Sequence, residues 1–349
     1  MSIHGNRITD NALTADSGEN LITKAIHNIE QNTEWHVSDK EKFAGAHGVY
    51  YDSKKIGSFF VEVENKKGVK GVLKLQLRPL PFDEGFIIHF IERQIKSQII
   101  RLLKIYLDNA WNEKDGYGFL IFEDVSHLPN LWKNLPPSKK EDFQNHKIFL
   151  KEFLNNILPI EPFIERPKET PLQQAEESFS HFFTIATNSS HKHIEVNEIL
   201  EYKEKYFNAL KNAKFGDLHF THGHLTGLDV KVDNRQFVVL ANLYWKWRPK
   251  YYELIFPVWN SLMQVRNRDF SFDDFMEIVH HWNELWSTEL YDHNPILEQQ
   301  YWISLLGFAM NTIMLDLGSS EWIDGEKEEK ATLLKRWKDF FEWIIENKF

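Results

Sequence analysis

His224, Asp229 and Asn242 are side chains whose types allow chemistry, and they lie on one short stretch of the sequence. Histidine can accept a proton near neutral pH, with an ordinary pKa of about 6.5. Carboxylate oxygens are the ligands that Mg²⁺ prefers, and an amide oxygen is a weaker one. If the fold brings these three side chains together, they can combine a proton acceptor with an oxygen-lined ion site.

The elements that must position them can be read from the same stretch. Residues 222–229 predict a tight loop. Residues 230–232 alternate apolar and basic side chains, and residues 237–240 form an apolar run, so both predict strands. Asp233 and Asn234 between them are typical turn residues. The loop and Asn242 are therefore tied to the two ends of one hairpin, which places the three side chains at one end of a sheet.

This pattern resembles the aminoglycoside phosphotransferase and choline kinase-like branch of the protein-kinase fold, which carries His-Gly-Asp-Leu-His-Pro-Gly-Asn, a hairpin and then Ile-Asp-Phe or Ile-Asp-Trp. In that family the loop Asp positions the substrate hydroxyl, and the Asn and the later Asp hold Mg²⁺ on the nucleotide phosphates. His222 and Gly223 match. The resemblance aligns His224 with the catalytic Asp, Asp229 with the Asn, and Asn242 with the second Asp.

Because all three central positions differ in type from the family, two function classes stay open. The first is a pseudokinase, or a related nucleotide- or small-ligand-binding protein. The second is an ATP-dependent phosphotransferase acting on a small-molecule hydroxyl, with His224 as the base and with Asp229 and Asn242 on the metal. A scaffold that binds only a protein partner is a third possibility. ATP and Mg²⁺ are the expected cofactors if nucleotide binding is present.

A competing alignment places the catalytic Asp at Asp217, in Gly216-Asp217-Leu218-His219, which is closer in letters to the family motif. His222 would then replace the Asn, and Asp229 would be the metal-binding Asp. Too few residues would remain between His222 and Asp229 for two strands and a turn, because strands need about five residues each. The alignment on His224 is therefore preferred, and Asp217 is kept as the rival.

Lys74 and Glu92 are predicted to form an ion pair. Residues 58–64 and 71–77 predict a hairpin, and Lys74 lies in Val-Leu-Lys-Leu, which resembles the Val-Ala-Ile-Lys strand of kinases. Residues 83–109 predict a helix because apolar residues recur at helical spacing, and Glu92 lies within that apolar stripe. A carboxylate there needs a partner. The resemblance implies that the pair orients Lys74 on the nucleotide phosphates.

Residues 118–125 form an apolar run that ends in acids and predicts a buried strand. It resembles the last strand of the small lobe and the hinge, which implies that Glu123 and Val125 lie beside the adenine. Residues 244–254 resemble the Gly-Asp-Pro-x-Tyr-Asp-Leu that opens a large-lobe helix, with Glu253 at the position of the Asp.

The predicted fold is α+β and bilobal, as in protein kinases. The N-lobe, residues 1–123, is expected to hold an antiparallel sheet and the helix that carries Glu92. The C-lobe, residues 124–349, is expected to be mostly helical and to contain the loop and hairpin at 222–243.

Composition narrows the function further. A net charge of −10 without a dense basic patch argues against nucleic-acid binding. The chain has no cysteine, which excludes disulfides and thiolate chemistry. It shows no signal core and no apolar run of membrane length, so a cytoplasmic protein is expected. The 27 Phe, 12 Trp and 11 Tyr indicate an aromatic core or an aromatic box for a cationic ligand.

Overall fold

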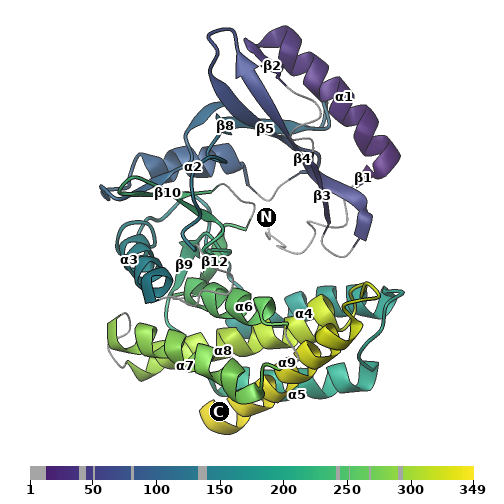
Figure 1. The fold of residues 1–349 in the computed structure, drawn as a ribbon, viewed down its shortest axis with the longest axis vertical. Coiled ribbons are helices and arrows are strands. Elements are labelled where there is room, and N and C mark those ends of the chain that lie inside the picture. The colour runs from purple at the N-terminus through teal and green to yellow at the C-terminus, as the bar shows by residue number, and fades with distance from the viewer. Residues whose placement is uncertain are drawn as a thin grey trace. The chain divides into compact units, whose positions relative to one another are not determined.

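The chain divides into two compact units. The computed structural model describes residues 13–38, 45–49, 52–79, 82–132, 140–240, 244–250, 252–266, 269–289 and 294–349. The first unit is Met1–Pro129 with Lys231–Leu243, and the second is Asn130–Val230 with Tyr244–Phe349 (Figure 1). The boundary therefore falls after Pro129 rather than after Glu123. The predicted hairpin joins the first unit, because its second strand pairs there.

The first unit is built on an antiparallel sheet in which seven of the described strands take part, in the order β1-β4-β5-β8-β7 with β2 and β3 also paired to β4. A smaller sheet has the order β10-β11-β6. The elements are β1 (Leu13–Thr14), α1 (Ala15–Asn32), β2 (Trp35–Val37), β3 (Gly45–Val49), β4 (Asp52–Asn65), β5 (Lys70–Gln76), α2 (Glu84–Glu92), β6 (Ile100–Leu102), β7 (Ile105–Asn109), β8 (Gly118–Glu123), β10 (Val230–Asp233) and β11 (Gln236–Val239).

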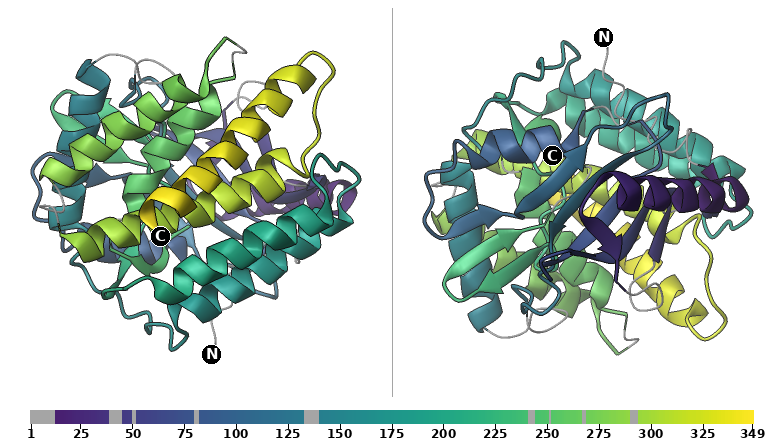
Figure 2. Two further views of the ribbon diagram at one scale, coloured as in Figure 1. Left: turned by 90° about the horizontal axis from the view of Figure 1, so that it is seen from below. Right: turned by 90° about the horizontal axis from the view of Figure 1, so that it is seen from above.

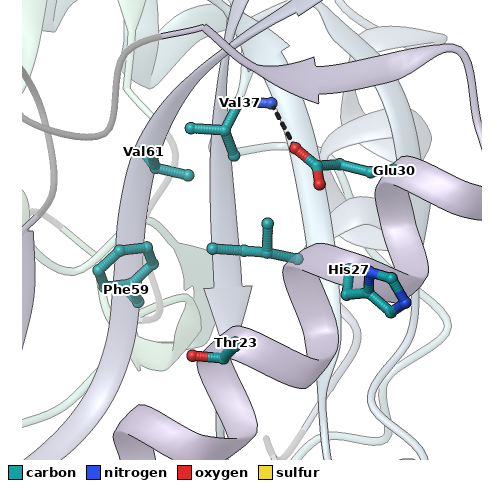
Figure 3. Close-up of a pocket in the computed structure, with 7 residues that line it drawn as sticks. Thr23, His27, Glu30, Val37, Phe59 and Val61 are labelled. Carbon is teal, nitrogen blue, oxygen red and sulfur yellow. Dashed lines mark hydrogen bonds between the residues drawn. The ribbon is translucent and has the colours of Figure 1, made fainter.

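Helix α1 covers one face of the large sheet. Its Ile22, Ala25 and Ile29 are buried in one cluster with side chains of β4, β5 and β8. A hollow of about 300 Å³ lies on this face, between α1, β2 and β4. Figure 3 shows residues that line it, among them Glu30, which accepts a hydrogen bond from the backbone N–H of Val37. The hollow is lined by Thr23, Ile26, His27, Glu30, Val37, Phe59 and Val61.

The opposite face carries Lys74. In the register of β4 and β5, Phe60 lies opposite Lys74, while Phe59 and Val61 lie opposite Leu75 and Leu73. Because side chains alternate along a strand, Lys74 points away from the face that α1 covers. An apolar cluster on the side of Lys74 contains Val72, Leu103, Leu120, Phe122, Val125 and Val238.

Helix α2 is much shorter than the predicted helix at 83–109. It begins after the N-cap residue Asp83, whose carboxylate accepts a hydrogen bond from the N–H of Phe86, and it ends at Glu92. Of the isoleucines and leucines that follow Glu92, two lie in β6 and two in β7, while Ile95, Ile99 and Leu103 lie in the segments between these elements. Strand β6 runs parallel to β11, with Ile100 opposite Phe237. This long-range pairing overrides the local helical spacing of the apolar residues.

The predicted Lys74–Glu92 pair is wrong, and Glu84 is the partner of Lys74. Lys74 Nζ lies 2.7 Å from Glu84 Oε2, and the two side chains are 4% and 0% exposed. Gln76 donates to the same oxygen at 3.2 Å. Burial raises the pKa of Glu84, and the attraction of Lys74 opposes this rise. The Glu92 side chain is 51% exposed, at the end of α2.

The second unit is mostly helical, with β9 and β12 as an antiparallel pair. Helices α8 and α9 lie side by side, and α4 lies along α5 (Figures 1 and 2). Its elements are α3 (Lys140–Asn156), α4 (Pro171–Asn188), α5 (Val196–Asn212), β9 (Leu218–Thr221), β12 (Lys246–Pro249), η1 (Tyr252–Leu254), α6 (Ile255–Gln264), α7 (Phe272–Glu289), α8 (Pro295–Asn311), the π-helix η2 (Thr312–Leu317) and α9 (Lys327–Lys348).

Large aromatic side chains fill the core of this unit. The fully buried ones include Trp282, Trp286, Trp302 and Trp337, so these tryptophans serve packing. Among the described residues, no helix has both the length and the apolar content that a membrane crossing requires.

The Lys74–Glu84 pair makes a testable contribution to stability. Glu84→Ala leaves the buried ammonium of Lys74 without its carboxylate, so we expect the free energy of unfolding to fall by about 3–5 kcal/mol. Glu92→Ala, the matched control on the same helix, should change it by less than about 0.5 kcal/mol. Urea unfolding followed by tryptophan fluorescence measures both. Equal losses in the two variants would contradict the assignment of Glu84.

Candidate functional site

Residues 222–229 form a loop that joins β9 to β10. Strands β10 and β11 are neighbours, and Asn234 in the turn between them has a φ of 54°. Loop, strand, turn and strand therefore occur in the predicted order. Asp217 is exposed and directly precedes β9. Because residues 222–229 are a loop rather than a hairpin, the structure gives no support to the rival alignment on Asp217.

The buried carboxylate of Glu253, 1% exposed, fixes the start of this loop. It accepts hydrogen bonds from the hydroxyl of Thr221 and from the backbone N–H of Gly223. It also accepts one from the N–H of Leu225, at 3.3 Å. Burial raises the pKa of Glu253, while these donors and the positive charge of Arg248 oppose the rise. One side chain of η1 thus fastens three successive points of the chain around His224.

Gly223 and Arg248 fit together closely. Gly223 has a φ of +77°, a conformation that side-chain-bearing L residues rarely adopt, and a Cβ there would collide with the guanidinium of Arg248. Arg248 Nη1 donates to the carbonyl oxygen of Tyr244 at 2.7 Å, and its guanidinium lies 4.7 Å from the ring centre of Tyr252. The loop can take this path because residue 223 has no side chain.

Trp132 covers the middle of the loop. A side chain at Gly227 would overlap the Trp132 ring, and the backbone N–H of Trp132 donates to the carbonyl oxygen of Gly227 at 3.3 Å. The indole N–H of Trp132 donates to His146 Nδ1 at 2.8 Å. Burial lowers the pKa of His146 to about 3, so this histidine is neutral and acts as an acceptor. Trp132 is thus held in place on the loop.

Asp229 stabilises the loop through hydrogen bonds to Thr226, three residues earlier in the same loop. Its Oδ2 accepts hydrogen bonds from the N–H of Thr226 at 2.9 Å and from the Thr226 hydroxyl at 2.6 Å. The same oxygen lies 3.2 Å from His224 Nδ1. The Asp229 N–H donates in turn to the carbonyl oxygen of Thr226 at 3.1 Å. The sequence suggested Asp229 but missed Thr226, although a threonine three residues before an aspartate is a known turn signal.

His224 and Asp229 perturb each other's pKa. Burial alone would lower the pKa of His224, but the hydrogen bond and negative charge of Asp229 outweigh it, and the net shift is upward. Burial alone would raise the pKa of Asp229, but the bonds and charge of His224 and the bond from Thr226 produce a net downward shift. Both shifts favour an imidazolium–carboxylate pair near neutral pH.

Two aromatic rings flank the imidazole of His224. Tyr244 is stacked on it, with 5.2 Å between ring centres and 24° between planes, and Phe256 lies at 5.3 Å. The His224 side chain is 36% exposed. Within the described part of the chain, the side-chain hydrogen bond of the imidazole is the one between Nδ1 and Asp229. The sequence did not single out Tyr244 or Phe256.

Few side-chain oxygens of this site could bind a metal ion. Asp229 Oδ2 is engaged by three hydrogen-bonding groups, so Oδ1 is the carboxylate oxygen that remains for a metal ion. Asn242 lies outside the described residues. Over the ranges that the structure describes, no group of three His, Cys, Asp or Glu side chains has the arrangement of a metal site. One carboxylate oxygen is a poor match to the carboxylate-rich environment that Mg²⁺ prefers.

The predicted hinge residues lie in the first unit, as does Lys74. The carboxylate of Glu123 is paired with Arg101 and accepts from the N–H of Lys104 at 2.8 Å. Val125 is 7% exposed and belongs to the apolar cluster on the side of Lys74. Its carbonyl oxygen accepts from the N–H of Leu128 at 3.0 Å. The Glu123 side chain is therefore occupied by the protein, and Val125 contributes apolar surface.

Comparison of the sequence with protein-family models and with curated proteins gives no match. Solved structures do match over almost the whole chain. A thermostable mutant of the aminoglycoside phosphotransferase APH(4)-Ia, in a ternary complex with AMP-PNP and hygromycin B, has a TM-score of 0.58 and 11% identity, with 93% of this chain and 98% of that chain covered. The chain has the aminoglycoside phosphotransferase fold.

Two further structures agree. The amicoumacin kinase hAmiN, in complex with AMP-PNP, Ca²⁺ and Ami, has a TM-score of 0.56 and 12% identity and covers 93% of this chain and 96% of its own. The spectinomycin phosphotransferase APH(9)-Ia, in complex with ADP and its antibiotic, has a TM-score of 0.50 and 11% identity, with 93% and 97% covered. The predicted kinase-like fold, an antiparallel sheet followed by a mostly helical part, is confirmed. At this identity the likeness concerns the fold alone.

The fit between Gly223 and Arg248 predicts the outcome of one substitution. Gly223→Ala should lower the free energy of unfolding by about 2–4 kcal/mol, because it adds a strained positive φ and a clash. In an Arg248→Ala background the clash is gone, and the loss from Gly223→Ala should fall to about 1–2 kcal/mol. Gly325→Ala is the control, since a Cβ there meets nothing within 4 Å. Urea unfolding of the four variants gives the values, and an unchanged loss in the Arg248→Ala background would exclude the clash.

Proposed function

We propose that this chain is a pseudokinase: a protein of the aminoglycoside phosphotransferase fold that binds a nucleotide without the two-metal site of an active kinase. The observation that carries the proposal is the bond between His224 Nδ1 and Asp229 Oδ2, at 3.2 Å. In the alignment of the sequence with the family motif, these side chains correspond to the catalytic and metal positions. In this chain they pair with each other, and the N–H and hydroxyl of Thr226 also donate hydrogen bonds to Asp229 Oδ2. The loop and hairpin follow the order expected for the family, but the loop carries no carboxylate that is free for catalysis.

Nucleotide binding is supported by the first unit. Lys74 is held by Glu84 and Gln76, so its ammonium has one fixed position on the sheet. A lysine fixed in this way suits contact with nucleotide phosphates. Val125 and its apolar neighbours lie on the same side of the sheet and supply a surface of the kind that an adenine ring packs against.

Metal dependence is expected to be weak. The fold family implies Mg²⁺ on the nucleotide, which would supply charge neutralisation at the phosphates. The residues of this chain do not fit that role well, because Asp229 offers one remaining carboxylate oxygen and Asn242 offers only an amide. The charge of Lys74 is the feature that favours phosphate binding here.

A second ligand, a small molecule, is part of the proposal. The matched structures are complexes with hygromycin B, Ami or spectinomycin together with a nucleotide or its analogue. Tyr244 is 50% exposed, and the neighbouring Tyr252 and Phe256 belong to the same aromatic group around His224. Such rings favour an organic ligand with a flat or cationic part. A protein partner that recognises the nucleotide-bound state is also compatible with a pseudokinase.

Thermal unfolding with nucleotide tests the proposal. AMP-PNP at a hundred times its Kd should stabilise the protein by about 2.7 kcal/mol, and the shift should be the same with Mg²⁺ or with EDTA. Lys74→Met combined with Glu84→Gln should abolish the shift relative to that variant's own ligand-free midpoint, without leaving a buried unpaired charge. Lys70→Met, at an exposed lysine on the same strand, is the control. A shift that requires Mg²⁺ would argue for a working metal site and against a pseudokinase.

One observation favours a second function, an active phosphotransferase for small-molecule hydroxyls. A carboxylate that holds Nδ1 of a histidine lets Nε2 accept a proton once the ring is neutral, as in catalytic His–Asp pairs. In that case His224→Ala should lower phosphate transfer by about 100-fold or more while the AMP-PNP shift persists. ADP release with a panel of hydroxyl-bearing antibiotics measures transfer. Full activity in His224→Ala would exclude His224 as the base.

A further inference from the structure

One face of strand β12 carries two basic side chains. Lys246 and Arg248 are two residues apart, so they lie on the same face of the strand. The register with β9 places Lys246 opposite Thr221. Arg248 reaches back along its own strand, because its Nη1 donates to the carbonyl oxygen of Tyr244 at 2.7 Å. The guanidinium is therefore turned toward Lys246, and its positive charge acts on that side chain. All of these residues belong to the second unit.

Neither cation has a carboxylate as a direct partner. Across the described ranges, no Asp or Glu side chain forms an ion pair with Lys246 or Arg248. The Arg248 guanidinium bonds to a neutral carbonyl group and lies 4.7 Å from the ring centre of Tyr252. The carboxylate of Glu253 attracts Arg248, but it is already engaged by hydrogen-bond donors of the loop at 221–225.

More distant charges compensate Lys246 only in part. Burial and the positive charge of Arg248 lower the pKa of Lys246 to about 8, and two carboxylates, those of Glu177 and Glu169, oppose this shift. Two like charges that are partly withdrawn from water raise the free energy of the folded protein unless an anion accompanies them. The protein as a whole carries a net charge of −10, so this local excess of positive charge does not follow from composition. A bound anion would supply the missing opposite charge.

We propose that Lys246 and Arg248 together bind the negatively charged group, a carboxylate or a phosphate, of the small-molecule ligand of the second unit. The inference rests on the second ligand proposed above, and it narrows that ligand from a flat or cationic molecule to one that carries an anionic group. A guanidinium offers paired N–H donors that match a carboxylate or phosphate, and an ammonium adds a compact positive charge.

Tyr244 connects the two cations to the aromatic group around His224. Its carbonyl oxygen accepts the hydrogen bond from Arg248, and its ring is stacked on His224. Tyr244 is 50% exposed, so its ring offers a surface on which a flat ligand can pack. The ligands that use both features are organic anions with a flat ring.

The experiment compares benzoate with benzylamine, which have the same ring and opposite charges, and adds inorganic phosphate as a third probe. Thermal unfolding of the full chain is followed at pH 7 and constant ionic strength, so that screening is the same in every sample. We expect benzoate and phosphate to raise the midpoint of the unsubstituted chain and benzylamine to leave it unchanged. Lys246→Met should lose both gains, whereas Lys211→Met, at an exposed lysine of α5, should keep them.

Amine labelling gives a second measurement, which uses the unsubstituted chain and so does not depend on the folding of a variant. An acetylating reagent reacts with the neutral amine, and a bound anion raises the pKa of Lys246. A rise of one unit lowers the neutral fraction, and with it the labelling rate, about tenfold at pH 7. Mass spectrometry gives the rates at Lys246 and Lys211, and benzoate should slow the first without changing the second.

AMP-PNP binding, measured on the same variants, separates this inference from the nucleotide proposal. Lys246→Met should keep the AMP-PNP shift, because Lys74 is the lysine proposed to contact the nucleotide phosphates. A shift with anions but none with AMP-PNP overturns nucleotide binding alone. Equal anion shifts in Lys246→Met and the unsubstituted chain, a benzylamine shift as large as that of benzoate, or unchanged labelling of Lys246 overturns the anion site. Loss of the AMP-PNP shift in Lys246→Met overturns it as well, since the bound anion would then be the nucleotide.

Discussion

The buried carboxylate of Glu253 is the interaction on which the rest of the site depends. It accepts from Thr221, Gly223 and Leu225, and so ties the end of β9 to both sides of His224. Two of these donors are backbone N–H groups that sit in a loop, where no sheet or helix satisfies them. A buried N–H that loses its acceptor costs about 1–3 kcal/mol, so the carboxylate and the loop path stabilise each other. The position of the His224 backbone follows from this constraint.

The residues of the loop divide into those that determine the path of the backbone and those that determine the chemistry of the site. Gly223 and Gly227 permit close contact with Arg248 and Trp132, and Glu253 anchors the turn. Asp229 belongs to both groups, because its Oδ2 closes the turn through Thr226 and also holds His224. A carboxylate engaged in this way favours a protonated or oriented imidazole over a bound cation. The same contact that orders the loop therefore argues against a kinase-type metal centre.

The sequence predicted the parts of this arrangement that depend on local pattern. Alternation at 230–232, the turn at Asp233 and Asn234, and the apolar run at 237–240 were sufficient to define the hairpin. It could not predict the long-range parts. The isoleucines after Glu92 have helical spacing, yet β6 forms because Ile100 and its neighbours pair with β11. The match of Lys74 to Glu92 failed for another reason. Glu84 and Glu92 lie four residues before and four residues after Ile88, so helical spacing alone did not decide which carboxylate meets Lys74.

The position of Lys74 is set by its partner, Glu84. Glu84 is the first residue of α2, beside the N-cap Asp83, so the pair is fixed where the helix begins. Helix termini leave backbone N–H groups unsatisfied, which favours carboxylates at this end. Ile87, Ile88 and Ile91 are each 2% exposed or less, so they fasten the short helix to the sheet. Because rotating α2 away would expose those side chains and leave a buried ammonium without its partner, Lys74 has a fixed position on the sheet. The first unit thus supplies a preorganised cation, while in the second unit the histidine and aspartate are committed to each other, and this contrast makes phosphate binding easier to account for than metal-dependent transfer to a hydroxyl.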